Sequence, residues 1–185
     1  MNGTKQAVYK IVDFIKSDRR GLLLTGTMEH EKHLLIISAL HRYYKGKRIL
    51  VRGNTLNQLH LSFELKKHKM SGLPFPIGNN VYIFDTFNPV AQKTTKGKEY
   101  DFAILFLNTM SLSNGIRDVN RNKDVIKELL KNRNIGKLFL VMNFGFEVTA
   151  LSEFYSDHVI YDIEEQDAKA HNSILNGWQE IYQNG

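Results

Sequence analysis

A glycine, two glutamates and a lysine stand close together near the start of the chain, in the segment GTMEHEKH from Gly26 to His33. Gly26 and Lys32 have the spacing of the first glycine and the lysine in the pattern G-x-x-x-x-G-K-[ST]. In that pattern, loop amides and a helix N-terminus bind phosphate, and the last hydroxyl holds Mg²⁺. The segment therefore has the spacing of a phosphate-binding loop.

Two positions of this loop carry the wrong chemistry. Glu31 stands where a second glycine lets the backbone wrap the phosphates, and its carboxylate repels them. His33 replaces the hydroxyl that binds Mg²⁺. The residues Gly26, Glu31, Lys32 and His33 thus predict a degenerate phosphate loop, with no nucleotide cofactor and no ATP hydrolysis.

A second element of ATP-hydrolysing sites is an acid pair at the end of a strand, which binds Mg²⁺ and polarises water. In the apolar segment YDFAILFLN, Phe106 and Leu107 occupy those places. Asp101 lies at the opposite end of the segment. The loss of acids here is independent of the changes in the loop, and both predict an inactive site.

Other catalytic constellations are weaker. His30 and His33, with Glu29 and Glu31, have side chains that can bind metals, but no further ligand is identifiable, so we predict no metal site. The sequence has no G-x-S-x-G nucleophile motif, and its acids and lysines lack the order that a nuclease needs. We therefore assign no catalytic residue.

The elements that must position this loop alternate between strands and helices. Apolar residues at helical spacing predict helices over 4–17, 31–44, 56–67, 122–131 and 166–182. Short apolar runs predict strands over 22–25, 48–52, 81–85, 102–107, 137–142 and 158–163. This alternation is typical of a mostly parallel sheet with helices on both faces. We expect one α/β domain spanning residues 1–185, a three-layer fold of the P-loop NTPase (RecA-like) type.

Charge is unevenly distributed along the chain. The 185 residues carry 25 Lys and Arg against 19 Asp and Glu, a net charge of +6. Residues 151–185 contain seven acids and one lysine, so they carry −6 and the first 150 residues carry +12. A basic body of this kind can meet phosphates. The absence of cysteine and of a long apolar run leads us to expect a cytoplasmic protein that does not bind membranes.

Polar and basic residues follow several of the predicted strands. Loops after parallel strands gather at one edge of a sheet, where ligands bind. We therefore expect a single basic rim that contacts nucleic-acid phosphates. Its candidate residues are Arg52, Asn54, Thr55, Lys93, Lys96, Lys98, Arg117 and Arg121.

With its elements in this order, the chain resembles the first motor lobe of superfamily two helicases, nearest to the helicase subunits of type III restriction enzymes. The resemblance runs from about residue 6 to residue 178. GLLLTGTMEHEKHLLIISALHRYYKGKRILV is similar to the family's strand, phosphate loop, helix and second strand, and EYDFAILFLN to the strand that ends in the Asp-Glu box. KLFLVMNFGFE is similar to the strand that carries the Ser/Thr-Ala-Thr motif, without its hydroxyls.

The family's motor needs two such lobes with ATP between them, and this chain resembles one. The resemblance therefore implies a catalytically inactive lobe that acts as a nucleic-acid-binding accessory factor, with DNA as the favoured partner. Two alternatives stay open. One is a non-catalytic interaction module that docks on a protein with a second motor lobe or self-associates, and the other is an active NTPase with an atypical phosphate loop.

Overall fold

The structure, a computed structural model, places seven strands in one sheet with the order β3-β4-β2-β5-β6-β1-β7. It describes residues 3–28, 31–65, 71–107, 115–142 and 148–183, without the side chains of 115–118 and 177–183. The strands are β1 (Gly21–Thr25), β2 (Arg48–Gly53), β3 (Pro74–Ile77), β4 (Asn80–Thr86), β5 (Glu99–Phe106), β6 (Asn134–Val141) and β7 (Asp157–Ile160). Only the pairing of β3 with β4 is antiparallel, so the described sheet is mostly parallel, as predicted.

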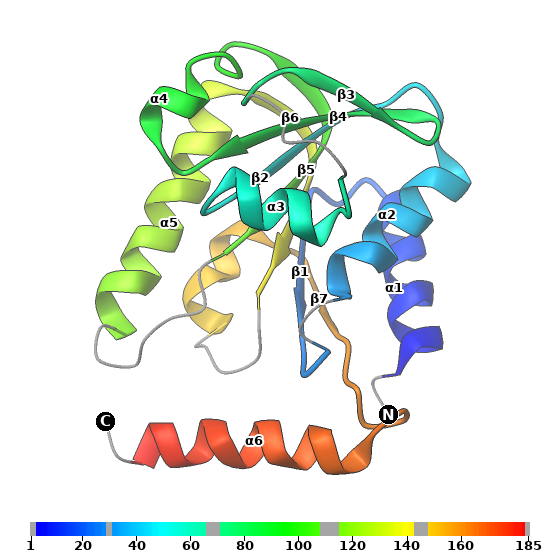
Figure 1. The fold of residues 1–185 in the computed structure, drawn as a ribbon, viewed down its shortest axis with the longest axis vertical. Helices are drawn as coiled ribbons and strands as arrows, with labels where there is room; N and C mark the ends of the chain where they lie inside the picture. Colours follow the sequence, from blue (N-terminus) through cyan, green and yellow to red (C-terminus); the bar gives the residue numbers. More distant parts are fainter. Residues whose placement is uncertain (1–2, 29–30, 66–70, 108–114, 143–147, 184–185) are drawn as a thin grey trace.

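Helices cover both faces of the sheet, which makes three layers (Figure 1). The helices are α1 (Thr4–Lys16), α2 (Lys32–Tyr43), α3 (Leu56–Ser62), α4 (Pro89–Gln92), α5 (Gly115–Asn132), the 3-10 helix η2 (Val148–Phe154) and α6 (Ala168–Gln183). Residues of α1, α2 and α3 pack in one apolar cluster, and residues of α5 and η2 pack in a second. The three-layer α/β fold is therefore confirmed.

Alternation along the strands explains why there are two apolar clusters. Leu22 and Leu24 of β1 belong to the cluster under α1 and α2, whereas Leu23 belongs to the cluster under α5. Successive strand side chains point to opposite faces, and both faces are covered, so the buried strands are apolar at nearly every position. All five residues of β1 are buried.

Several elements differ from the sequence expectation, among them η2, which was not predicted, and α3, which ends at Ser62 and not at residue 67. The stretch before β4, for which no strand was predicted, contains the edge strand β3, whose Pro74 and Pro76 suit an unpaired edge because proline lacks an amide donor. The helix α4 is a single turn with Pro89 at its start, too short for a periodic pattern. The helix α5 begins at Gly115, seven residues before its predicted start at Asn122.

The sheet has two unlike edges. The ends of β1, β2, β5, β6 and β7 lie at the carboxyl edge, and the starts of the same strands lie at the amino edge. Figure 1 shows α6 running across the carboxyl end of the molecule, beyond the ends of β1 and β7. No helix in the described ranges is long and apolar enough to span a membrane.

Candidate nucleotide site and basic surface

The strand order brings together the three strand ends that the resemblance implicates. β1, whose end leads into the expected phosphate loop, pairs with β6, and β6 pairs with β5. Both pairings are parallel, so the ends of β1, β5 and β6 share the carboxyl edge. The fold thus provides the place for a nucleotide site, and the residues at that place decide what can bind there.

The expected phosphate loop is tied to the segment after β7. Gly26 has φ +122°, and a Cβ added to it would lie 2.1 Å from the carbonyl oxygen of Tyr161. The amide of Tyr161 donates to the carbonyl oxygen of Thr25 at 2.8 Å, and the amide of Met28 donates back to the carbonyl of Tyr161 at 3.2 Å. Gly26 is required here because two backbone segments approach closely.

The first loop amide after Gly26 already donates a hydrogen bond to a carboxylate of the chain itself. The amide of Thr27 donates to Oδ1 of Asp162 at 2.9 Å, and the hydroxyl of Thr27 lies 3.2 Å from the same oxygen. That hydroxyl also lies 2.9 Å from Nδ1 of His171 in α6 and accepts from the amide of Ile163 at 3.1 Å. Oδ1 of Asp162 thus accepts the kind of amide hydrogen bond that a phosphate oxygen accepts in a phosphate loop.

The start of α2 is buried in the same region. Lys32 and His33 are 0% and 3% exposed. Nε2 of His33 donates to the carbonyl oxygen of Ser62 at 2.8 Å, and its ring lies against those of Phe63 and Phe106. His33 therefore packs as an apolar and hydrogen-bonded core residue. Glu31, at the helix N-cap, makes no side-chain capping bond.

The ends of β5 and β6 are apolar in the described residues. Leu107 and Met142 are buried, and Phe106 packs against the cluster under α2. Asp101 lies near the amino edge, where it accepts from Nζ of Lys47 at 2.8 Å and from the amide of Arg48 at 2.9 Å. Glu29, His30, Asn143 and Phe144 lie outside the described residues. Within the described ranges, no group of three or more His, Asp or Glu side chains could hold a metal ion.

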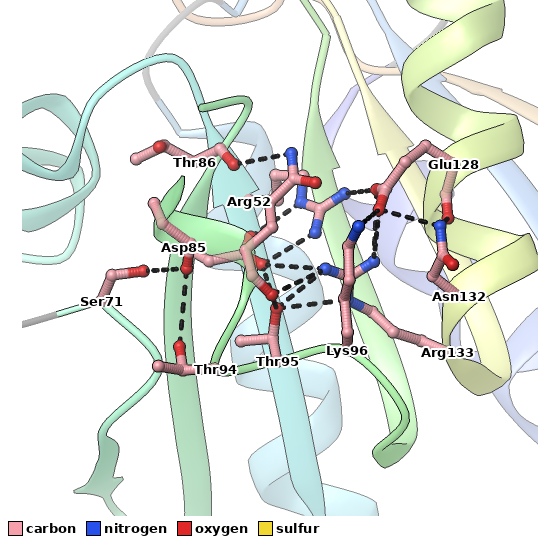
Figure 2. A network of polar contacts seen from close by, with 12 residues as sticks. Arg52, Ser71, Asp85, Thr86, Thr94, Thr95, Lys96, Glu128, Asn132 and Arg133 are labelled. Carbon is pink, nitrogen blue, oxygen red and sulfur yellow. Dashed lines mark hydrogen bonds and ion pairs between the residues drawn. The ribbon is translucent and has the colours of Figure 1, made fainter. Parts of the chain in front are cut away.

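The buried position of Arg52 contradicts the expectation of one basic rim. It was expected to reach phosphates at the end of β2, but its side chain is 1% exposed and lies between the sheet and α5. Its guanidinium donates to both oxygens of Asp85, at 2.7 and 2.8 Å, and to Glu128 at 2.7 Å. Figure 2 shows the guanidinium between these two carboxylates. Alternation in β2 places Arg52 on the covered face with Leu50, so it stabilises the fold and cannot contact nucleic acid.

The network around Arg52 includes a second buried arginine. Arg133 donates to Glu128 at 3.1 Å and to the hydroxyl of Thr95 at 2.9 Å, and Thr95 donates to Asp85 at 2.6 Å. The network joins β2, β4, α5 and the loop before β5 (Figure 2). Sequence reasoning missed it because Arg52, Asp85 and the nearby pair Glu128 and Arg133 are far apart in the chain, and Arg52 was interpreted as a surface residue.

Acid should weaken this network. Burial by itself would raise the pKa of Glu128, but hydrogen bonds and charge from Arg52 and Arg133 outweigh it and hold that pKa below its ordinary value near 4.5. A lowered folded-state pKa contributes stability that is complete above pH 4.5 and is lost as pH falls through the lower folded value. We expect the free energy of unfolding, from urea titrations, to fall below pH 4.5, and Glu128→Gln to flatten that decline. Asp124→Asn, at an exposed carboxylate of the same helix, is the control and should leave the decline unchanged.

The remaining basic candidates do not form one rim. Asn54 and Thr55 are exposed at the carboxyl edge, where Thr55 caps α3 by accepting from the amide of Gln58 at 3.2 Å. Lys98 lies at the amino edge, since its carbonyl accepts from the amide of Asn134 at the start of β6. The single rim is therefore wrong as a geometric prediction.

The other candidates lie between these two positions. Lys93 is exposed after α4, and Lys96 is partly exposed, 3.9 Å from Glu128. Arg121 is exposed on α5, and the side chain of Arg117 lies outside the described residues. Their contact with nucleic acid stays a prediction.

Cations gather instead at the amino edge. Nine that are at least partly exposed lie in the last turns of α1, α2 and α5, in the loops after α1 and α2, at the start of β2 or directly before β5, with five acids among them. The cations are Lys16, Arg19, Arg20, Arg42, Lys45, Lys47, Arg48, Lys98 and Lys131, and the acids are Asp13, Asp18, Glu99, Asp101 and Asp157. We call this set of nine the amino-edge cations.

Helix geometry accounts for part of the set. Helices that connect parallel strands run back toward the amino edge, and basic residues in their last turns interact favourably with the helix dipole. Lys16, Arg42 and Lys131 lie in the last turns of α1, α2 and α5, where they can interact with the helix dipole in this way. Six others lie outside the helices. Of these, Arg20, Lys45, Arg48 and Lys98 are exposed and form no ion pair within the described part of the chain.

The carboxyl edge beside β1 has the opposite charge. The segment that follows β7 supplies Asp162, Glu164, Glu165 and Asp167. Four acids of the negative C-terminal part thus lie next to the expected phosphate loop, and the amino-edge cations lie at the other end of the sheet. This separation was not visible in the sequence, because it depends on which way each strand runs.

Comparison with known proteins gives a structural likeness alone. No protein-family profile and no curated relative matches the sequence. Among solved structures, the large terminase of a thermophilic bacteriophage is similar, with a TM-score of 0.48 and 11% sequence identity. The similarity covers 85% of this chain and 45% of the terminase chain, so this chain spans less than half the length of that protein.

Proposed function

We propose that this chain is a nucleic-acid-binding accessory protein, related to one motor lobe of superfamily two helicases and without ATP hydrolysis of its own. The observation that carries the proposal is the set of amino-edge cations. Arg20, Lys45, Arg48 and Lys98 precede or begin β1, β2 and β5 and are exposed without ion-pair partners in the described residues. Exposed cations of this kind bind phosphates and release counterions.

A salt series tests the proposal. We expect labelled DNA to bind at about 50 mM salt and to lose affinity steeply by about 200 mM, with log K linear in log salt. The triple variant Lys45→Gln, Arg48→Gln and Lys98→Gln should weaken binding and reduce the slope by about 2 to 3. A triple variant with the same charge change elsewhere, at the exposed Lys5→Gln, Lys10→Gln and Lys169→Gln, should keep most of the affinity. An absence of binding at low salt, or a flat salt dependence, would refute the proposal.

The loop contacts support the absence of ATP hydrolysis. The amide of Thr27 is hydrogen-bonded to Asp162 and is not available to a phosphate. Glu31 and three further acids lie near the same edge, so a nucleoside triphosphate would meet negative charge where it needs hydrogen-bond donors. We expect no change in melting temperature with ATP and Mg²⁺, because only a ligand that binds the folded state raises it. Changing Glu31→Gly and His33→Thr should create no binding until Asp162→Ala is added. A rise of several degrees in the unaltered protein would favour the active-NTPase alternative.

A further inference from the structure

A cavity of about 370 Å³ opens at the amino edge, between the end of α5, the start of β6 and η2. Its walls include Leu130, Ile135 and Phe154, and its polar lining includes Arg20, Asn134 and Glu153. The cavity lies at the opposite end of the sheet from the expected phosphate loop, so it is separate from the degenerate nucleotide site.

The apolar walls suit a flat, unsaturated group. Phe154 is half-buried, and Leu130 at the mouth is 43% exposed. Nζ of Lys127 lies 5.8 Å from the ring centroid of Phe154 and 3.5 Å from Oε1 of Glu153. An aromatic ring beside a cation is a stacking surface that accepts any nucleobase, because every base has a π-face. A volume of this size is at the lower end of the range for small-molecule cavities and is ample for one base.

The polar residues suit the edge of a base. Glu153 accepts hydrogen bonds, Arg20 donates them, and the amide of Asn134 does both. Base edges present donors and acceptors side by side, so a mixed lining fits them better than a lining of one kind. The side-chain amide of Asn134 donates to Oε1 of Glu99 at 3.2 Å, which fixes its position at the cavity rim.

Arg20 belongs both to the cavity lining and to the amino-edge cations. A strand whose phosphates follow these cations therefore passes the mouth of the cavity. Bases of a duplex are stacked and paired, so removing one requires unstacking and unpairing it, whereas a base of a single strand is available at once. We propose that the chain binds single-stranded nucleic acid along the amino edge and takes one base into this cavity against Phe154. This inference rests on the proposed function and specifies its substrate.

Two variants of the full chain test the cavity without changing its charge. Phe154→Ala removes the stacking surface, and Leu130→Trp fills the mouth from an exposed helix position. The matched controls are Leu61→Ala and Leu61→Trp, because Leu61 is 77% exposed on α3, on the other face of the sheet. Circular dichroism and a urea titration check that each variant is folded, and Leu130→Trp keeps the test decisive if Phe154→Ala does not fold.

The probes are a single-stranded DNA of about 12 nucleotides, the same strand lacking its bases at the centre, and the corresponding duplex. The unaltered protein should prefer the intact single strand on the order of tenfold over both others. Each cavity variant should lose that preference while keeping its affinity for the duplex, and the Leu61 variants should lose nothing. A fluorescent adenine analogue in the strand should change its emission on binding to the unaltered protein and not to Phe154→Ala.

Equal affinity for duplex and single strand, or cavity variants that behave as the Leu61 controls do, would overturn the cavity proposal while leaving nucleic-acid binding in place. No binding of any probe at low salt would overturn the proposed function and this inference together. The two failures are therefore distinguishable in one set of titrations.

Discussion

Replacing Arg52 by Met is expected to lower the free energy of unfolding by about 3–5 kcal/mol, because it leaves a buried charge without its partner. The side chain of Asp85 is 0% exposed and accepts two hydrogen bonds from Arg52. Without Arg52, Asp85 keeps the hydroxyl of Thr95 and the guanidinium of Arg133, whose Nη2 is 3.7 Å away. Urea unfolding near neutral pH, followed by circular dichroism, measures the loss.

The control for Arg52→Met is the same kind of substitution in an ion pair at the surface. Lys47→Met removes the pair of Lys47 with Asp101, whose side chains are 36% and 35% exposed. Pairs exposed to this degree contribute about 0–1 kcal/mol, because water and salt screen them. Adding Asp85→Leu to Arg52→Met should recover part of the stability, since no unpaired Asp85 then remains. A loss below 1 kcal/mol for Arg52→Met would show that the network is not maintained in solution.

Replacing Gly26 by Ala is expected to cost about 3 kcal/mol, from two sources. The residue has φ +122°, which strains any side chain, and the added Cβ would lie 2.1 Å from the backbone oxygen of Tyr161. Relief of that contact must displace the segment after β7, with loss of its hydrogen bonds to Thr25 and Met28. Thermal and urea unfolding measure the change.

Gly46 provides the matched control for Gly26. It also has a positive φ, +70°, but nothing lies within 4 Å of an added Cβ. Gly46→Ala therefore reports the conformational cost alone, about 1 kcal/mol. If the two variants lose the same stability, the close approach of Tyr161 to Gly26 is absent in solution, and with it the closed loop that supports the proposed absence of ATP binding.

Most of the elements were predictable because they are long or strongly apolar. The pattern Ala7, Val8, Ile11, Val12 and Ile15 predicted α1 to within one residue of its end, and Ala7, Ile11 and Ile15 are buried in the structure. The apolar strands β1, β2, β4, β5 and β6 were found for the same reason. β3, α4 and η2 were missed because four to seven residues contain too little periodicity, and the prolines of β3 are typical of turns.

The candidate site was predictable in its chemistry and not in its geometry. Glu31, His33, Phe106 and Leu107 could be recognised as unsuited to a nucleotide from their types and spacing alone. Their environment could not be predicted. The carboxylate that occupies the loop is Asp162, which is 135 positions from Thr27 in sequence, and no local pattern joins the two.

Sequence by itself determined the α/β class, the missing phosphate-loop and acid-pair residues, and the surplus of positive charge in the first 150 residues, because these depend on local periodicity and residue type. Tertiary structure alone decided where that charge acts. The direction of each strand sends Lys98 to the amino edge and leaves Asn54 at the carboxyl edge. The helix α5 turns Arg52 from an expected surface cation into the buried partner of Asp85, because alternation along β2 places its side chain on the face of the sheet that α5 covers.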